Sequence, residues 1–210
     1  MLEGESIMNT KVKKETRQYF VWYSGSFLIV GGVVAFFHII NGSSFIYGVD
    51  AYCQDYPVFL YLGKALRHFL WTGSFRLYDF SIGLGSNMIS ALNHNGFGDP
   101  LNLLAVFAVG NAAVYLYEFT LLLRLYLCGA AMLLFCRKHG KTAAISVSAA
   151  ILYAFSAFTL PYGLQFYQSL NAAYIFPLLL LMLEELLEQG EENRRGGGKI
   201  FPSYCPAGLL

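Results

Sequence analysis

The sequence predicts an all-α polytopic membrane protein with about four transmembrane helices. Three observations carry this prediction: a shortage of charged residues, long uncharged apolar runs, and the placement of basic residues between those runs. Of the 210 residues, 56% are hydrophobic and only 13% are charged, whereas soluble domains carry about 25% charged residues. The composition therefore favours a bilayer as the surroundings of most of this chain.

The first span is predicted over residues 19–40. This run of 22 residues contains no Asp, Glu, Lys or Arg, and about 20 apolar residues are enough to cross the hydrocarbon core as a helix. A cleaved signal peptide is disfavoured, because the run is too long and no small-x-small cleavage site follows it. By the positive-inside rule, the N-terminal segment 1–18 is predicted to be cytoplasmic, since it carries Lys11, Lys13, Lys14 and Arg17.

Residues 41–98 then form a long first extracytoplasmic loop. Within this loop, Pro57 suits the first turn of a helix and Gly73 suits its end, and the sequence between them is amphipathic. Two arrangements of this helix stay open: it lies in the membrane interface with its apolar side down, or it packs against the rest of the protein. The segment "SIGLGSNMIS" that follows is expected to form a turn and a short helix.

Three more spans are predicted, at about residues 113–136, 142–160 and 171–187. Residues 100–110 are too few to cross the membrane and are expected to form a short helix that enters it or lies on it. A single crossing at 113–136 leaves the basic segment "RKHGK" inside, as positive charge requires. The N-terminus and the end of the fourth span are then cytoplasmic.

Residues 191–210 are expected to be a cytoplasmic or aberrant tail. The closing segment "GGGKIFPSYCPAGLL" stands where another apolar span would be expected after a charged cytoplasmic loop. We therefore expect the chain to be the N-terminal part of a larger protein, truncated or frame-shifted after about Lys199.

The composition and the cysteine spacing exclude several classes of function. No CxxC or His/Cys spacing is present, so a zinc or redox site is not expected. No cofactor is expected, although a divalent metal stays open. The chain has no basic stripe interleaved with aromatic residues, and a nucleic-acid partner is therefore not expected.

The stretch "GVDAYCQDYP" at residues 48–57 places two carboxylates shortly after the first span. If it is α-helical, Asp50 and Gln54 share a face, and Asp55 points about 140° away from Asp50, so the two acids would not form a dyad. Asp55 is interpreted as a residue that satisfies free amides at the start of a helix. Asp50 is either a plain loop carboxylate or a group that does chemistry at the membrane surface.

Polar residues elsewhere are candidates for binding substrate. Arg124 lies near the middle of the second span, where a charge costs at least about 2.5 kcal/mol unless it faces protein or water. We expect it to pair with a donor phosphate or with a carboxylate on another helix, and we expect Glu118 near the outer interface. Sugar-binding or plain loop and interface roles are open for Asn87, Asn93, His94, Asn95, Gln165, Tyr167, Gln168 and Asn171.

Three blocks of the sequence resemble, in order and spacing, the start of the YfhO family of bacterial multi-pass membrane proteins. They are Gly48, Asp50, Gln54, Pro57 and Phe59; then Gly83, Leu84, Gly85 and Asn87; then Pro100, Asn102, Leu103 and Leu104. The resemblance covers most of residues 19–190 and leaves out the tail. Val49 stands where the family usually has a second glycine, and family members are several times longer than this chain.

The resemblance implies the N-terminal part of a GT-C-like glycosyltransferase in the bacterial cell membrane. Such an enzyme takes a sugar from a polyprenyl-phosphate donor and transfers it to an extracytoplasmic polymer of the cell envelope, such as lipoteichoic acid. Asp50 takes the position of the acidic residue that acts in such enzymes as the catalytic base or orients the acceptor, and we expect Gln54, Asn87 and Arg124 to bind substrate. The alternative is a non-enzymatic membrane protein, such as a lipid or polymer transport subunit, or an inactive truncated fragment.

Overall fold

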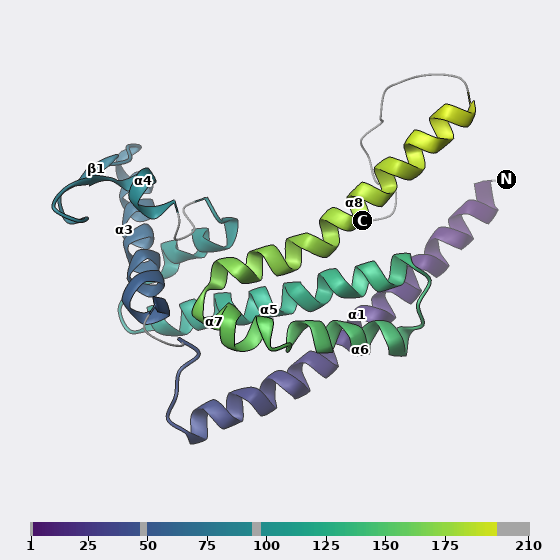
Figure 1. Ribbon diagram of the computed structural model, residues 1–210, viewed down its shortest axis with the longest axis horizontal. Helices are drawn as coiled ribbons and strands as arrows, with labels where there is room; N and C mark the ends of the chain where they lie inside the picture. The colour runs from purple at the N-terminus through teal and green to yellow at the C-terminus, as the bar shows by residue number, and fades with distance from the viewer. Residues whose placement is uncertain (1, 47–49, 94–97, 197–210) are drawn as a thin grey trace.

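Four long helical segments lie side by side in the computed structural model, which describes residues 2–46, 50–93 and 98–196, with side chains from residue 16 to residue 190 (Figure 1). They are α1 (Leu2–Ile40), α5 (Ala112–Lys138), α6 (Ala143–Ala154) and α8 (Tyr167–Gly196). Helix α5 is the central one, because it packs against α6 on one side and α8 on another, while α1 packs mainly on α6. The all-α class is confirmed.

Three of these helices are long and apolar enough to cross a membrane: Thr16–Ile40, Ala112–Lys138 and Tyr167–Gly190. A fourth crossing is possible if α6 and the bent segment after it count as one span. The prediction of a polytopic protein with about four spans is therefore confirmed. The last span begins at Tyr167, four residues before the predicted start.

The third predicted span, 142–160, is not one straight helix. Helix α6 ends at Ala154, and the chain bends by 44° before a second helical piece, Phe158–Gln165. The twelve residues of α6 rise only about 18 Å, which is less than the hydrocarbon core. Hydroxyl groups take up backbone atoms freed by the break, since Thr159 Oγ1 donates to the carbonyl of Ala154 at 2.6 Å and Ser156 Oγ accepts from the amide of Thr159 at 3.3 Å.

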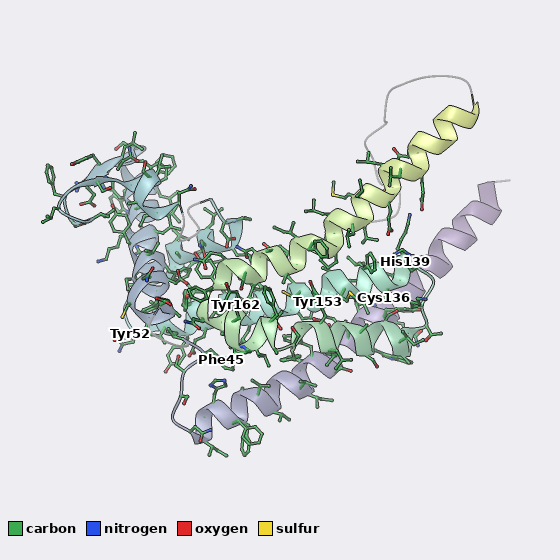
Figure 2. The ribbon with its side chains drawn as sticks, in the orientation of Figure 1. Phe45, Tyr52, Cys136, His139, Tyr153 and Tyr162 are labelled. Atoms are coloured by element: carbon green, nitrogen blue, oxygen red, sulfur yellow. The ribbon has the colours of Figure 1, made fainter. Side chains whose placement is uncertain are left out.

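Most of the connecting segments gather at one end of the bundle, which we call the loop end, whereas the short connection between α5 and α6 lies at the opposite end. The segments at the loop end include η1 (Ala51–Asp55), α3 (Tyr56–Thr72), η2 (Pro100–Phe107), η3 (Phe158–Tyr162) and α7 (Gly163–Gln165). Figure 2 places Phe45 and Tyr52 toward this end, and Cys136 and His139 toward the opposite one, the far end. The segments predicted to lie outside the cell therefore share one side of the bundle. Which side of the membrane this is stays a prediction.

A small antiparallel hairpin follows α3. Strand β1 (Tyr78–Asp79) pairs with β2 (Ser86–Asn87), and the short helix α4 (Met88–Leu92) comes directly after it. The tight connection requires glycine, because Gly83 and Gly85 both have positive φ angles of 51° and 111°. The expected turn followed by a short helix is present at these residues.

Helix α3 packs against the rest of the protein, which is one of the two arrangements predicted for the amphipathic segment. Phe59, Leu62 and Gly63 are buried on α3, and its main neighbour is η2. A β-carbon at Gly63 would collide with the carbonyl oxygen of Ala105. The residue without a side chain therefore allows the two elements to approach closely.

Candidate functional site

Asp50 and Gln54 lie one helical turn apart at the start of the helical stretch that leads into α3. Nε2 of Gln54 donates to Oδ1 of Asp50 at 3.0 Å, so the two side chains share a face as expected. The other oxygen of Asp50, Oδ2, accepts from Nε2 of Gln165 at 3.3 Å. Asp50 is half-buried, and among the described residues no Lys, Arg or His side chain forms a salt bridge with it.

Asp55 is not a helix cap, and the sequence-based interpretation of this residue is wrong. The chain is already helical from Asp50 onward, and the Asp55 side chain makes no capping hydrogen bond. Its side chain is buried and accepts from Nε2 of Gln168 at 3.0 Å. The interior position reflects the continuous helix, which satisfies the backbone amides that a cap would otherwise serve.

The residues from Ala51 to Asp55, directly after Asp50, form a π-helix, whereas the predicted offset of 140° between the two acids assumed an α-helix. The amide of Tyr56 donates to the carbonyl of Ala51, five residues earlier, and this spacing defines a π-helix. Five positions therefore complete about one turn, and Asp50 and Asp55 both reach glutamines of one segment, at positions 165 and 168. We call Asp50, Gln54, Asp55, Gln165 and Gln168 the acid–amide cluster. π-Helical turns inside helices occur frequently at functional sites.

A second polar network lies deeper, around Arg124. Nη2 of Arg124 donates to Oδ2 of Asp99 at 2.6 Å and to Oδ1 of Asn102 at 2.8 Å, and Nε donates to Oδ1 of Asn171 at 3.1 Å. The side chains of Arg124 and Asp99 are only 1% and 5% exposed. The guanidinium also lies over the ring of Tyr167, 4.6 Å from its centroid. Of the two partners predicted for Arg124, the structure contains the carboxylate, and phosphate binding by Arg124 stays a prediction.

Asp99 is held by several further hydrogen bonds within the protein. Besides Arg124, its Oδ2 accepts from Nδ2 of Asn171 at 2.7 Å, and its Oδ1 accepts from the amide of Leu101 at 2.9 Å. Asp99 is thus the N-cap of η2 as well as the counter-ion of Arg124. Asp99 was not among the residues predicted from the sequence, although an acid directly before Pro100 is a typical helix-start pattern.

One short segment supplies both networks. Gln165 and Gln168, three positions apart, bond the acids, whereas Tyr167 and Asn171, four positions apart, contact Arg124. Gln165 ends α7, and the other three residues lie in the first turns of α8, with the non-helical Phe166 between the two helices. The junction of α7 and α8 therefore contributes side chains to both the acid–amide cluster and the Arg124 network. All four residues are among the polar candidates for sugar binding that were predicted from the sequence.

Asn87 lies away from both networks. Its Oδ1 accepts from the amides of Ile89 and Ser90 at 3.0 and 3.2 Å, which makes it the N-cap of α4. Substrate binding by Asn87 stays a prediction. Glu118 accepts from Oγ of Ser44 at 2.5 Å and from the amide of Phe45 at 3.2 Å, so it fastens the chain after α1 to α5. His94 and Asn95, two other candidates, lie outside the described residues, as does the tail from residue 197.

Metal ligands are not clustered in the part of the chain that the structure describes. No group of three His, Cys, Asp or Glu side chains there is arranged to hold an ion. What the acid–amide cluster offers chemically is a half-buried carboxylate at the edge of the bundle, oriented by two neutral amides. Such a group can accept a proton from a hydroxyl.

The chain was compared with protein families, curated proteins and solved structures. The model of the family described as "Bacterial membrane protein YfhO" matches residues 25–192. No curated protein and no solved structure matches the chain. The matched range includes both polar networks and all the spans except the beginning of the first.

Proposed function

This chain belongs to the YfhO family of bacterial membrane proteins, and from that premise we propose that it forms part of a membrane glycosyltransferase. The donor is a sugar carried on a polyprenyl phosphate, and the acceptor is a hydroxyl of an extracytoplasmic cell-surface polymer such as lipoteichoic acid. Asp50 is the catalytic base. The observation that carries the proposal is the Asp50 carboxylate itself, half-buried at the loop end and held by the amides of Gln54 and Gln165.

The proposed step is a displacement at the anomeric carbon of the donor sugar. The acceptor hydroxyl gives its proton to a carboxylate oxygen of Asp50 while its oxygen forms the new bond to that carbon. The bond between the anomeric carbon and the phosphate oxygen breaks, and the polyprenyl phosphate leaves with the electron pair. A positioned general base of this kind contributes about 10²–10⁴ to a rate.

The position of Asp50 suits a lipid-linked donor. Asp50 follows the end of α1, Ile40, by ten residues, and the loop end collects the segments next to the ends of the spans (Figure 1). A polyprenyl phosphate keeps its chain in the hydrocarbon and its phosphate at headgroup depth. A base beside that phosphate has to lie just beyond a span, and the short separation of Asp50 from Ile40 supports such a position for Asp50.

The two glutamines act as positioning residues in this proposal. Each amide occupies one oxygen of Asp50, and this fixes the plane of the carboxylate relative to the bundle. Neutral donors leave the negative charge of Asp50 in place, whereas a cation would neutralise it. The remaining lone pairs of the two oxygens stay available to the acceptor hydroxyl.

The test is a transfer assay on membranes that contain the chain, supplied with a radiolabelled polyprenyl-phosphate sugar and a glycerol-phosphate polymer. Asp50→Asn should reduce transfer by about 10²–10⁴-fold, whereas Glu188→Gln, an exposed change at the far end, should leave it unchanged. Full activity of Asp50→Asn would show that Asp50 is not the base. Absence of transfer by the unmodified chain would favour the non-enzymatic alternative.

A further inference from the structure

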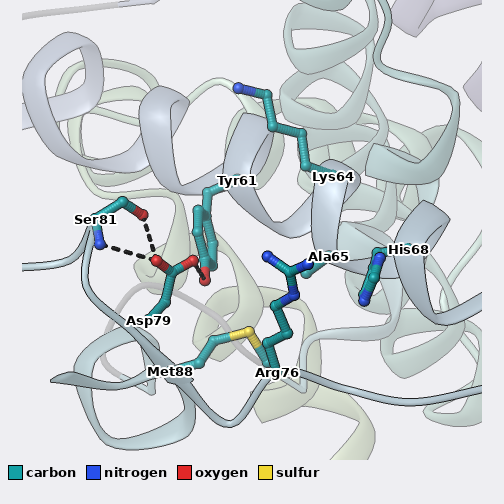
Figure 3. A pocket seen from close by; sticks show the side chains of 8 residues that line it. All are labelled: Tyr61, Lys64, Ala65, His68, Arg76, Asp79, Ser81 and Met88. Carbon is teal, nitrogen blue, oxygen red and sulfur yellow. Dashed lines mark hydrogen bonds between the residues drawn. The ribbon is translucent and has the colours of Figure 1, made fainter. Parts of the chain in front are cut away.

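A pocket separate from both polar networks opens between α3 and the hairpin (Figure 3). Its volume is about 300 Å³. Tyr61, Lys64 and His68 line it from α3, at spacings of three and four that place them on one face of the helix. Arg76 and Asp79, just before and within β1, line the opposite wall. In the view of Figure 3 the guanidinium of Arg76 lies between the side chains of Tyr61 and His68.

The pocket carries more positive than negative charge. Lys64 and Arg76 are its basic residues besides His68, and Asp79 is the one carboxylate among its lining residues. Both oxygens of Asp79 are occupied: Oδ2 accepts from the Tyr61 hydroxyl at 2.7 Å, and Oδ1 accepts from the amide and hydroxyl of Ser81, each at 2.8 Å. Among the described residues, Lys64, His68 and Arg76 form no salt bridge.

We propose that this pocket binds a phosphodiester group of the acceptor polymer. The proposal rests on the proposed function, which already takes a polyol-phosphate chain as the acceptor, and it adds the place where that chain is held: its repeating phosphates meet Lys64 and Arg76. The pocket holds the chain at one point, and a hydroxyl of another repeat reaches Asp50. Lysine and arginine are the side chains that form charge-assisted hydrogen bonds to phosphate, and a pocket of about 300 Å³ lies within the usual size range of small-ligand sites.

The donor phosphate does not fit the same pocket, because the pocket is too far from the acids. Lys64 and His68 follow Asp55 by nine and thirteen positions along one continuous helix, which corresponds to roughly 14 and 20 Å along its axis. Asp50 lies a further helical turn away. The donor phosphate is bonded directly to the anomeric carbon that reacts at Asp50, so it cannot reach this distance. A polymer with a phosphate in every repeat spans it.

Binding of a fluorescein-labelled oligo(glycerol phosphate) to the detergent-solubilised chain tests the proposal. The double variant Lys64→Gln/Arg76→Gln should weaken binding about tenfold or more, and added salt should weaken binding to the unmodified chain. Lys141→Gln removes one positive charge from an exposed position between α5 and α6, at the far end, and should leave the affinity unchanged. Equal binding by the double variant and the unmodified chain would overturn the proposal.

A second arm separates the polymer from a lipid headgroup. The chain is titrated with phosphatidylglycerol vesicles, and the oligomer is offered as a competitor. A charge-dependent interaction with the vesicles that the oligomer does not compete for would assign the pocket to a headgroup and overturn the proposal. Competition by the oligomer, lost in the double variant, supports it.

A third arm keeps this inference distinct from the proposed function. Asp50→Asn should bind the oligomer as tightly as the unmodified chain, because the pocket and the acid lie at different places on the helix. If the chain transfers no sugar but binds the oligomer through Lys64 and Arg76, the binding role of the pocket is supported and the proposed enzyme activity is refuted. If the chain transfers sugar but its affinity for the oligomer does not depend on Lys64 and Arg76, the binding role of the pocket is refuted and the proposed enzyme activity is supported.

Discussion

Asp50 and Asp99 both lie at the loop end and both contact the segment 165–171, but their partners differ in charge. Asp99 is buried against the guanidinium of Arg124 at 2.6 Å and also caps η2. Asp50 is half-buried, and its hydrogen bonds come from the neutral amides of Gln54 and Gln165. The carboxylate of Asp99 is therefore bound in a buried ion pair, whereas the carboxylate of Asp50 has neutral hydrogen-bond donors, as its proposed role as a base requires.

The difference shows how a membrane helix can carry an arginine without exposing it to lipid. Arg124 is fully buried in α5, and its donors reach η2 and α8 through Asn102 and Asn171. Removing one partner of a buried ion pair leaves an uncompensated charge and costs about 3–5 kcal/mol. The Arg124 network is therefore expected to determine stability, and the acid–amide cluster activity.

The largest expected effect comes from making the same substitution at both acids. Asp99→Asn should lower the free energy of unfolding by about 3–5 kcal/mol, because Arg124 then stays buried without a counter-charge. Asp50→Asn should change it by no more than about 0.5 kcal/mol, as is usual for sites without a buried charge partner. Denaturant titration in mixed micelles measures both. Equal losses at the two positions would remove the distinction between the networks.

Substitutions at Gln165 test whether its side-chain amide positions the carboxylate of Asp50. Gln165→Ala should reduce kcat about tenfold and leave KM nearly unchanged, since it removes a positioning contact of Asp50. Gln165→Glu should move the acidic limb of the pH–rate profile to higher pH, because a second carboxylate disfavours the charged form of Asp50. An unshifted profile in Gln165→Glu would mean that this contact does not act through the carboxylate.

Two tyrosines at the boundary between the networks form a matched pair. The Tyr167 hydroxyl accepts from Nδ2 of Asn102 at 2.8 Å, whereas the buried hydroxyl of Tyr117 has no hydrogen-bond partner within the described part of the chain. Tyr167→Phe should cost about 1 kcal/mol of stability, and Tyr117→Phe should cost nothing or stabilise slightly. Thermal unfolding of the two variants in one detergent compares them. A larger loss for Tyr117→Phe would indicate an unrecognised partner.

The smallest effect concerns Asp79, a partly exposed carboxylate on β1 that lies outside both polar networks. The amide of Ser81, followed by the hydroxyls of Tyr61 and Ser81, lowers its pKa below the usual value of 3.8. Its contribution to holding the hairpin on α3 is therefore complete above pH 3.8 and is lost as the pH falls through the lower value in the folded protein. Limited proteolysis of the hairpin should accelerate below this pH.

Tyr61 sets the upper pH limit of its hydrogen bond to Asp79, as Asp79 sets the lower one. Burial, and then the hydrogen bond to Asp79, raise its pKa from 10.0 to about 12. The contact should be intact below pH 10 and lost as the pH rises through about 12. In Asp79→Asn the acid-dependent acceleration of proteolysis should disappear. Persistence of the acid effect in that variant would assign it to another group.

Much of the fold follows from local pattern. The uncharged run 19–40 and the apolar run around 113–136 are long enough to span by composition alone, and α1 and α5 cover them. Pro57 and Gly73 mark the ends of the amphipathic segment, and α3 ends at Thr72, where Gly73 adopts a φ of 70°. The break after Ala154 was not predicted. Hydropathy does not indicate which side-chain hydroxyls form hydrogen bonds with backbone groups that lose their helical partners.

The sequence by itself determined the membrane class, the helical spans, the shared face of Asp50 and Gln54, and the need of Arg124 for a partner. These depend on composition, helical period and the cost of an isolated charge in hydrocarbon. Only the tertiary structure decided which carboxylate pairs with Arg124, that Asp55 is buried against Gln168, and that both acids meet one segment. The contacts of Asp50 and Asp55 join residues more than a hundred positions apart, and the ion pair of Arg124 joins residues 25 positions apart. Contacts over such separations leave no local pattern in the chain.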